Sequence, residues 1–180
     1  NSKAYEVLTN LSSTKNNIIL DFNYTASTRL ILKQCGLSDE DIDNRLIKDH
    51  GVASNNDIIF GVEDNAGIKK EHVFLRKAYN IKYKALNFSE LYDRIKSVAI
   101  FGHSLGETDH TYFNKLFQES CMYNKFSTNN NKEFWLFYYK ENGYHCMMQQ
   151  LDSLTHNSLT SFRQYNRVNF INTDKEKVFI

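Results

Sequence analysis

Short apolar runs alternate with segments of helical spacing along the chain. Runs of four to eight apolar residues, rich in β-branched or aromatic side chains, are typical of buried strands. Apolar residues three and four positions apart instead indicate a helix with one buried face. The pattern predicts strands over 17–22, 57–62, 97–101, 133–139 and 167–171. It predicts helices over 2–11, 27–34, 69–80, 88–95, 109–121 and 143–154, and a further helix that starts at 38–41.

This order of elements sets the fold class. Strands that alternate with helices at this spacing form βαβ units, and such units build a largely parallel sheet. We therefore expect an α/β fold with a Rossmann-like, largely parallel sheet flanked by helices. Ser27 or Thr28 is expected to cap the second helix, and Gly36 to end it. An exposed turn is expected at 129–131.

Composition agrees with a folded protein and excludes several function classes. Hydrophobic residues make up 41% of the chain, enough for a sizeable core. The net charge is +1 and no basic block is present, so nucleic acid is not expected as a partner. No run of about 18 apolar residues occurs, so no membrane span is expected. Cys35, Cys121 and Cys146 form no C-x-x-C pair, and we expect reduced cytoplasmic thiols and no metal centre.

One motif suggests a serine hydrolase. The segment GHSLG, residues 102–106, follows a strand and matches G-x-S-x-G, in which a tight strand–helix turn exposes the serine, here Ser104. Such an enzyme needs an acid and then a histidine downstream, and Asp152 followed by His156 has that order. These two residues are too close in sequence for successive strand ends, and residues 107–110 would crowd a helix packed on a sheet. The hydrolase remains an alternative.

Two polar segments occupy positions where ligands bind to open parallel sheets. The segment DFNYT, residues 21–25, ends the first strand. Its Asn23 offers a donor and an acceptor to a ribose or a water, although an Asx turn that stops the strand is the preferred explanation of this segment alone. Asp49-His50-Gly51 follows, with His50 about 27 residues after Asn23. A histidine beside a carboxylate suits a general base, although a solvated loop histidine is the simpler explanation.

The order of these pieces resembles the AbiH family of bacterial abortive-infection proteins. The chain carries FNYT after a strand, then His-Gly, then IIFGVED, and then GHSLGETDHTYF after another strand. The resemblance covers about 17–117 and is strongest over 101–113. More distantly, the same order and spacing resemble the sirtuin-like NAD-binding fold. The resemblance therefore implies a bacterial anti-phage protein that binds or hydrolyses NAD.

The resemblance also implies roles for individual residues. In the sirtuin-like fold an Asn after a strand contacts the nicotinamide ribose and orders a water, and a His before Gly acts as the base. Those positions are Asn23 and His50 here. Gly102 and Ser104 would form part of the dinucleotide cradle, so that Ser104 binds ligand and is not a nucleophile. Asp109 would lie at the start of the next helix, where the helix dipole favours a carboxylate.

Two departures from the family pattern affect these expectations. Related proteins place a Gly-rich loop at the start of the fold, yet no glycine precedes Asn17, and the chain does not begin with Met. We therefore expect a single α/β domain over 1–180 that is the C-terminal part of a longer protein, with an upstream nucleotide-binding βα unit missing. Residues 44–48 are also more charged than a buried strand before His50 would be.

Other expectations concern partners and surfaces. A nucleotide ligand and an unidentified phage trigger are the expected partners, and self-association is left open. His103 and His110 have no implied role, and we expect both at the surface. A third alternative is a non-catalytic sensor whose partner surface is the aromatic stretch 134–139 with Tyr144. A buried central strand explains that stretch better, because it is apolar throughout.

Overall fold

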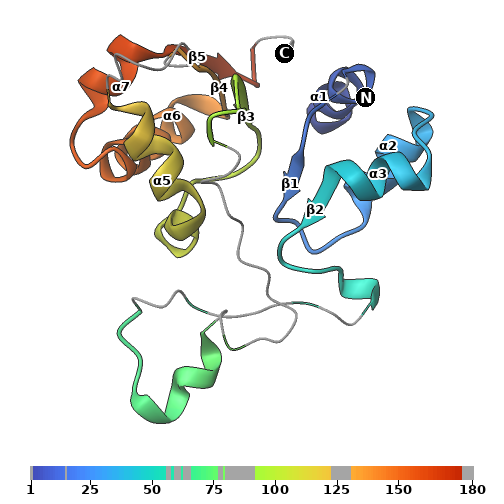
Figure 1. Cartoon of the computed structure of the whole chain (residues 1–180), viewed down its shortest axis with the longest axis horizontal. Helices are drawn as coiled ribbons and strands as arrows, with labels where there is room; N and C mark the ends of the chain where they lie inside the picture. The colour runs from blue at the N-terminus through green and yellow to red at the C-terminus, as the bar shows by residue number, and fades with distance from the viewer. Residues whose placement is uncertain are drawn as a thin grey trace. The chain divides into compact units, whose positions relative to one another are not determined.

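A computed structural model describes residues 2–14, 16–55, 58, 62, 66–76, 79, 92–122 and 131–175. The chain divides into two compact units, the first formed by Asn1–Ala85 with Phe179–Ile180 and the second by Leu86–Val178. Figure 1 shows the helices and strands of each, and the two units are described separately below. The expectation of a single domain over 1–180 stays a prediction.

The first unit combines helices with a two-stranded parallel sheet. Its helices are α1 (Lys3–Ser13), α2 (Ser27–Gln34) and α3 (Asp39–Arg45), and its strands are β1 (Ile19–Asp21) and β2 (Leu46–Lys48). Ser2 caps α1 by accepting from the Tyr5 N–H, and Ser38 caps α3 in the same way from Asp41 N–H. Gly36, at φ +90°, follows the end of α2 as expected.

Strand β2 forms in the segment whose charge argued against a strand. Its register pairs Ile19 with Leu46 and Asp21 with Lys48, so the lysine lies opposite a carboxylate on the neighbouring strand. The Lys48 ammonium and the Asp21 carboxylate are 2.9 Å apart. A charged residue fits this partly buried strand because its charge is paired.

The core of the first unit lies between its strands and helices. Ile19, Leu32 and Ile42 are buried from β1, α2 and α3, and leucines of α1, the α2–α3 turn and β2 pack against them. Arg45 joins the end of α1 to this core, since its guanidinium donates to the Leu11 carbonyl and to the Asn17 side chain. Local polar bonds and a small apolar cluster together hold three helices around two short strands.

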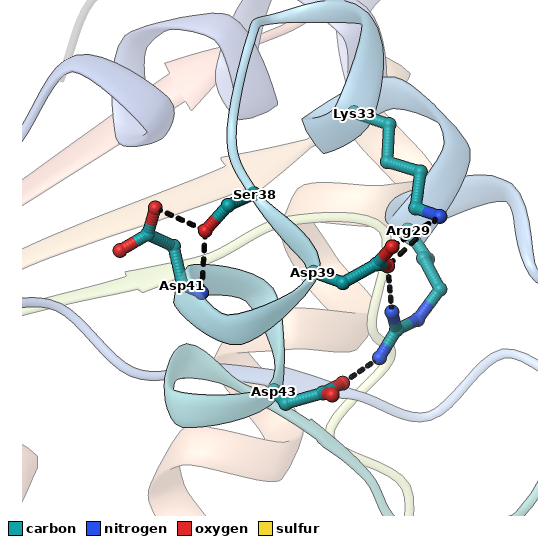
Figure 2. A network of polar contacts seen from close by, with 6 residues as sticks. All are labelled: Arg29, Lys33, Ser38, Asp39, Asp41 and Asp43. Atoms are coloured by element: carbon teal, nitrogen blue, oxygen red, sulfur yellow. Dashed lines mark hydrogen bonds and ion pairs between the residues drawn. The ribbon is translucent and has the colours of Figure 1, made fainter.

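An exposed ion-pair network joins α2 to α3 (Figure 2). The Arg29 guanidinium donates to the carboxylates of Asp39 and Asp43, and the Lys33 ammonium lies 2.8 Å from Asp39. These charges lower the pKa of the Asp39 carboxyl, chiefly through its hydrogen bond from Lys33. Because the groups are exposed and screened by solvent, we treat the network as a minor contribution to stability.

The segment after the first sheet differs from the sequence expectation. Its described elements are the 3₁₀ turns η1 (Ala53–Asn55) and η2 (Lys70–Leu75) and a parallel bridge between Val62 and Arg76. The expected α-helix over 69–80 is therefore wrong over residues 70–75. Its apolar residues there are adjacent in sequence, and both Phe74 and Leu75 are exposed. Most of the expected strand at 57–62 and helix at 88–95 lies outside the described residues.

The second unit is a three-stranded parallel sheet with helices between its strands. It contains β3 (Ser97–Ile100), the 3₁₀ turn η4 (Glu107–Asp109), α5 (His110–Ser120), β4 (Glu133–Tyr138), α6 (Lys140–Leu154), α7 (Leu159–Tyr165) and β5 (Arg167–Asn172). The strand order is β3-β4-β5, and both pairings are parallel. Parallel sheets flanked by helices confirm the expected α/β class.

Strand β4 is the central strand of this sheet, and its aromatic residues are mostly internal. Phe134 and Phe137 are buried, and Phe134 packs against Phe117 of α5 and Phe162 of α7 at ring separations of 5.6 and 4.7 Å. The preference for a buried strand over an aromatic partner surface is therefore confirmed. Tyr139, just after β4, is exposed.

A buried polar group holds the amino end of this sheet together. The Asn166 side-chain amide donates to the carbonyls of Ser120 and Phe162, and its oxygen accepts from the Lys132 N–H. The Lys132 ammonium donates to the carbonyls of Tyr92 and Ile95 at 2.7 Å each. Burial lowers the pKa of Lys132 below its usual range. These two side chains join the starts of β3, β4 and β5 to the ends of α5 and α7.

Several boundaries differ from the sequence expectation for identifiable reasons. No side chain of Ser27 or Thr28 caps α2: the N-cap residue is Ala26, and both candidates lie inside the helix. The short helix α7 has a single fully buried residue, Phe162, and no side-chain cap, so it left no clear pattern. The expected turn at 129–131 lies largely outside the described residues.

We expect Asn166→Ala to destabilise the second unit by about 2–3 kcal/mol, because three buried backbone groups lose their partner. Urea unfolding monitored through the fluorescence of Trp135, which lies in β4, measures this directly. Asn142→Ala, at an exposed position of α6, is the matched control and should change stability by less than about 0.5 kcal/mol. Equal stabilities of the two variants would contradict this role for Asn166.

Candidate functional site

Two polar loops meet at the carboxyl ends of β1 and β2. Parallel pairing places these ends at the same edge, so residues 22–25 after β1 lie beside residues 49–53 after β2. The Asp21 carboxylate, 4% exposed, accepts from the N–H of Asn23 at 2.9 Å and from the Asn23 side-chain amide at 3.1 Å. Asp21, and not Asn23 as the sequence suggested, is thus the acceptor of an Asx-type turn, while the Asn23 side chain donates to the same carboxylate and is exposed at the strand edge.

The Lys48 ammonium connects the two loops. It donates to the Asp21 carboxylate, to the Asn23 carbonyl and to the Thr25 carbonyl, the last at 2.9 Å. An ammonium has three N–H donors, and each has an acceptor here. Since two of these acceptors are backbone carbonyls, Lys48 fixes the main chain of the Asn23 loop as well as pairing a charge.

All four carbonyls of residues 22–25 accept from the segment 48–53. Phe22 accepts from His50 Nδ1 at 3.2 Å, and Tyr24 accepts from the Ala53 N–H at 2.8 Å. Asn23 and Thr25 accept from Lys48 as described above. Consecutive carbonyls bound by one neighbouring segment leave the loop little conformational freedom. The strand edge is therefore held by contacts within the chain itself.

His50 lies beneath this loop and is 7% exposed. Because the Phe22 carbonyl can only accept, Nδ1 is the donor in this contact. Nε2 lies 3.3 Å from the Asp49 carboxylate. Tyr24 stacks on the ring with centroids 5.4 Å apart, and Phe22 contacts it edge-on at 5.5 Å. A solvated loop histidine, the simpler sequence explanation, does not fit this burial.

The turn after β3 in the second unit is built around two left-handed residues. Gly102 has φ +65° and Leu105 has φ +55°. Leu105 adopts this conformation, unusual for a branched side chain, because its side chain is completely buried. Ser104, between them, is exposed. The turn therefore presents a glycine and a serine to solvent at the carboxyl end of a strand.

His103 and His110 hold this turn, which corrects the expectation that both lie at the surface. His103 Nδ1 accepts from the Leu105 N–H at 2.9 Å, and its Nε2 lies 3.4 Å from the Asp109 carboxylate. His110 Nε2 lies 3.0 Å from the Leu105 carbonyl and 2.9 Å from the Gln150 side chain. Histidines that hydrogen-bond to nearby backbone groups produce no hydrophobic pattern, so the sequence did not reveal these contacts.

Asp109 occupies the N-cap position of α5, as expected, but makes no side-chain capping bond there. Its carboxylate points instead toward His103. The Asp109 side chain is 15% exposed. In this structure its contact orients His103, which supports the turn. Contact with a ligand stays a prediction for Asp109, as it does for Gly102 and Ser104.

The geometry gives the serine-hydrolase alternative no support. A nucleophile elbow passes directly from strand to helix at a strained serine, whereas Ser104 is not one of the positive-φ residues and α5 begins only at His110. Asp152 is exposed on α6, and His156, just after that helix, lies with its Nε2 3.1 Å from the Gln118 amide. Neither is at a strand end, where this mechanism needs them.

A cavity of about 400 Å³ lies at the carboxyl ends of β4 and β5. Tyr138 and Asn172 at those strand ends line it, with Lys140, Glu141 and Tyr144 of α6 and the turn residues Asp174 and Lys175. None of the five sequence-predicted site residues contributes to it. Those five divide between the units, Asn23 and His50 in the first and Gly102, Ser104 and Asp109 in the second.

Sequence reasoning missed the residues that organise the first strand edge. Asp21 and Lys48 were within the segments considered, yet only their register across β1 and β2 shows that they pair. Tyr24 was taken as a strand terminator, whereas it stacks on His50. Each strand ends in a charged residue after two apolar ones, and this was the one available signal.

The fold and these strand edges define an α/β protein whose polar residues gather beyond the carboxyl ends of parallel strands. Residues 1–139 match the model of the family described as "Bacteriophage abortive infection AbiH". The chain therefore belongs to the AbiH family. No curated protein and no solved structure matches it. Within the described residues, no helix has both the length and the apolar character needed to cross a membrane.

We expect Gly102→Ala to destabilise the second unit by about 1–2 kcal/mol, because only the left-handed backbone conformation opposes the new methyl group. No heavy atom lies within 4 Å of a Cβ built there. Gly106→Ala is the control from the same turn, since its φ is −61° and its Cβ would meet only the Ser104 hydroxyl, at 3.3 Å. Trp135 fluorescence in urea measures both, and equal losses would contradict the assigned turn conformation.

Proposed function

We propose that this chain acts in bacterial defence against phage, by aborting infection, and that it does so in the cytoplasm by binding or hydrolysing NAD. Membership of the AbiH family supports the defence role. One observation carries the NAD proposal: the Asn23 and His50 loops are bound to each other at a single carboxyl edge of a parallel sheet. This is the edge at which α/β proteins bind nucleotides.

The proposed reaction is hydrolysis of the bond between nicotinamide and ribose. Water attacks the ribose carbon, nicotinamide leaves with the bonding electrons, and a base takes the proton of the water. Asn23 is the proposed group that holds the ribose and this water, since its side chain is exposed at the edge. His50 is the proposed base, a role that contributes about 10²–10⁴ in rate in other enzymes.

The surroundings of His50 suit that role and restrict access to it. The Phe22 carbonyl holds Nδ1, so the proton would be taken by Nε2, which lies 3.3 Å from the Asp49 carboxylate. Tyr24, which is 38% exposed, stacks on the buried ring, so in this proposal its side chain moves aside to admit the substrate.

For the second unit taken by itself, we propose that Gly102 and Ser104 contact a nucleotide, with Asp109 contributing at the start of α5. Gly102 and Ser104 are exposed after β3 in a turn that His103 and His110 hold. An unidentified phage component is proposed as the trigger of the activity, and a homo-oligomer as a form in which the chain acts.

The protein expressed from its native gene should release nicotinamide from NAD. We expect Asn23→Ala and His50→Ala each to lower that release at least about 100-fold, because each removes a reacting group. Asn44→Ala, on the exposed face of α3, and His145→Ala, on α6, are matched controls and should keep wild-type activity.

Chromatographic measurement of nicotinamide decides this proposal, in the purified protein and in phage-infected cells. Absence of release by the wild type under both conditions would overturn the NAD chemistry. Nicotinamide release that persists in both Asn23→Ala and His50→Ala would overturn the assignment of these two residues. Survival of the phage in cells that express the wild type would contradict the defence role itself.

A further inference from the structure

Lys48 differs from exposed charged groups of the first unit such as Lys33 because it binds the loop that carries Asn23. Its side chain is 17% exposed and the Asp21 side chain only 3%. The exposed ion pair of Lys33 with Asp39 in the same unit joins α2 to α3. Lys48 instead donates to two main-chain carbonyls of the loop that carries Asn23.

The Asp21 carboxylate also links Lys48 to the Asn23 side chain. One carboxylate oxygen accepts from Lys48, and the other accepts from both the N–H and the side-chain amide of Asn23. Lys48 therefore restrains Asn23 in two ways, directly through its carbonyl and indirectly through the Asp21 carboxylate. The same lysine immediately precedes Asp49 and His50, so the two loops are joined where their candidate groups lie.

We propose that Lys48 is the positioning residue of this site, which presets the Asn23 side chain relative to His50 before any ligand binds. This inference rests on the proposed function only in taking Asn23 and His50 as the reacting groups. Lys48 touches no substrate in this role; it acts through Asp21 and the carbonyls of the Asn23 loop.

The test must avoid leaving a buried charge unpaired, because a lone Asp21 carboxylate would destabilise the whole unit. We therefore choose the double variant Asp21→Asn with Lys48→Met, which removes both charges at similar volume. The matched control is Asp39→Asn with Lys33→Met, which makes the same two changes in the exposed network drawn in Figure 2.

Hydrogen exchange in the free protein, followed by NMR, gives the first readout. The Ala53 amide reports the loop because it donates to the Tyr24 carbonyl, and the Leu32 amide in α2 reports the unit as a whole. We expect the Asp21/Lys48 variant to speed Ala53 exchange roughly tenfold or more while Leu32 exchange stays unchanged. The control variant should change neither. Unchanged Ala53 exchange, or equal acceleration at both amides, would overturn the positioning role.

Turnover provides the second readout and separates the two proposals. If the wild type hydrolyses NAD, the Asp21/Lys48 variant should lose kcat at least tenfold with a smaller change in KM, since a misplaced Asn23 weakens the transition state more than binding. A variant with wild-type kcat would overturn the positioning role. Absence of any wild-type turnover would sink the NAD proposal, while the exchange result would still decide whether Lys48 presets the loop.

Discussion

The three N–H groups of the Lys48 ammonium meet three oxygens of the segment 21–25, and the candidate site of the first unit depends on that contact. Parallel pairing of β1 with β2 creates the contact by placing Asp21 directly opposite Lys48. Because β1 and β2 have only three residues each, the strands alone give little rigidity. The loops beyond them supply it, with four consecutive carbonyls bound by the neighbouring segment. The Asp21–Lys48 pair at the strand ends thus fixes the loops at this edge of a small sheet.

The second unit reaches a similar result with different groups. Its sheet is also entirely parallel, and a polar turn again follows a strand, but histidines replace the lysine. His103 holds the Leu105 N–H and His110 holds the Leu105 carbonyl, so both backbone groups of one left-handed residue are satisfied. Buried Leu105 anchors the turn from below, and Gly102 and Ser104 face solvent. In both units, side chains bound to the main chain fix the loop and leave short polar residues exposed at the edge.

Sequence patterns predicted the buried strands and the amphipathic helix α5 well, because apolar periodicity reports burial directly. They failed where polar pairing replaced burial. Strand β2 was judged too charged, since the Asp21 partner of Lys48 is distant in sequence and only their register reveals it. His103 and His110 were assigned to the surface because no pattern marks a histidine bound to nearby backbone. The strand-end position of Asn23 and His50 was predictable from motif order, whereas the contacts that hold them required coordinates.

The most direct measurement of a nucleotide site at the edge of the first sheet is an NMR titration of the ¹⁵N-labelled protein with NAD. We expect the Asn23 side-chain amide and the His50 ring resonances to shift together and saturate. Asn166, at the amino end of the second sheet, should not respond. Shifts confined to the cavity lined by Tyr138 and Tyr144, or no shifts at millimolar NAD, would contradict a dinucleotide site at Asn23 and His50.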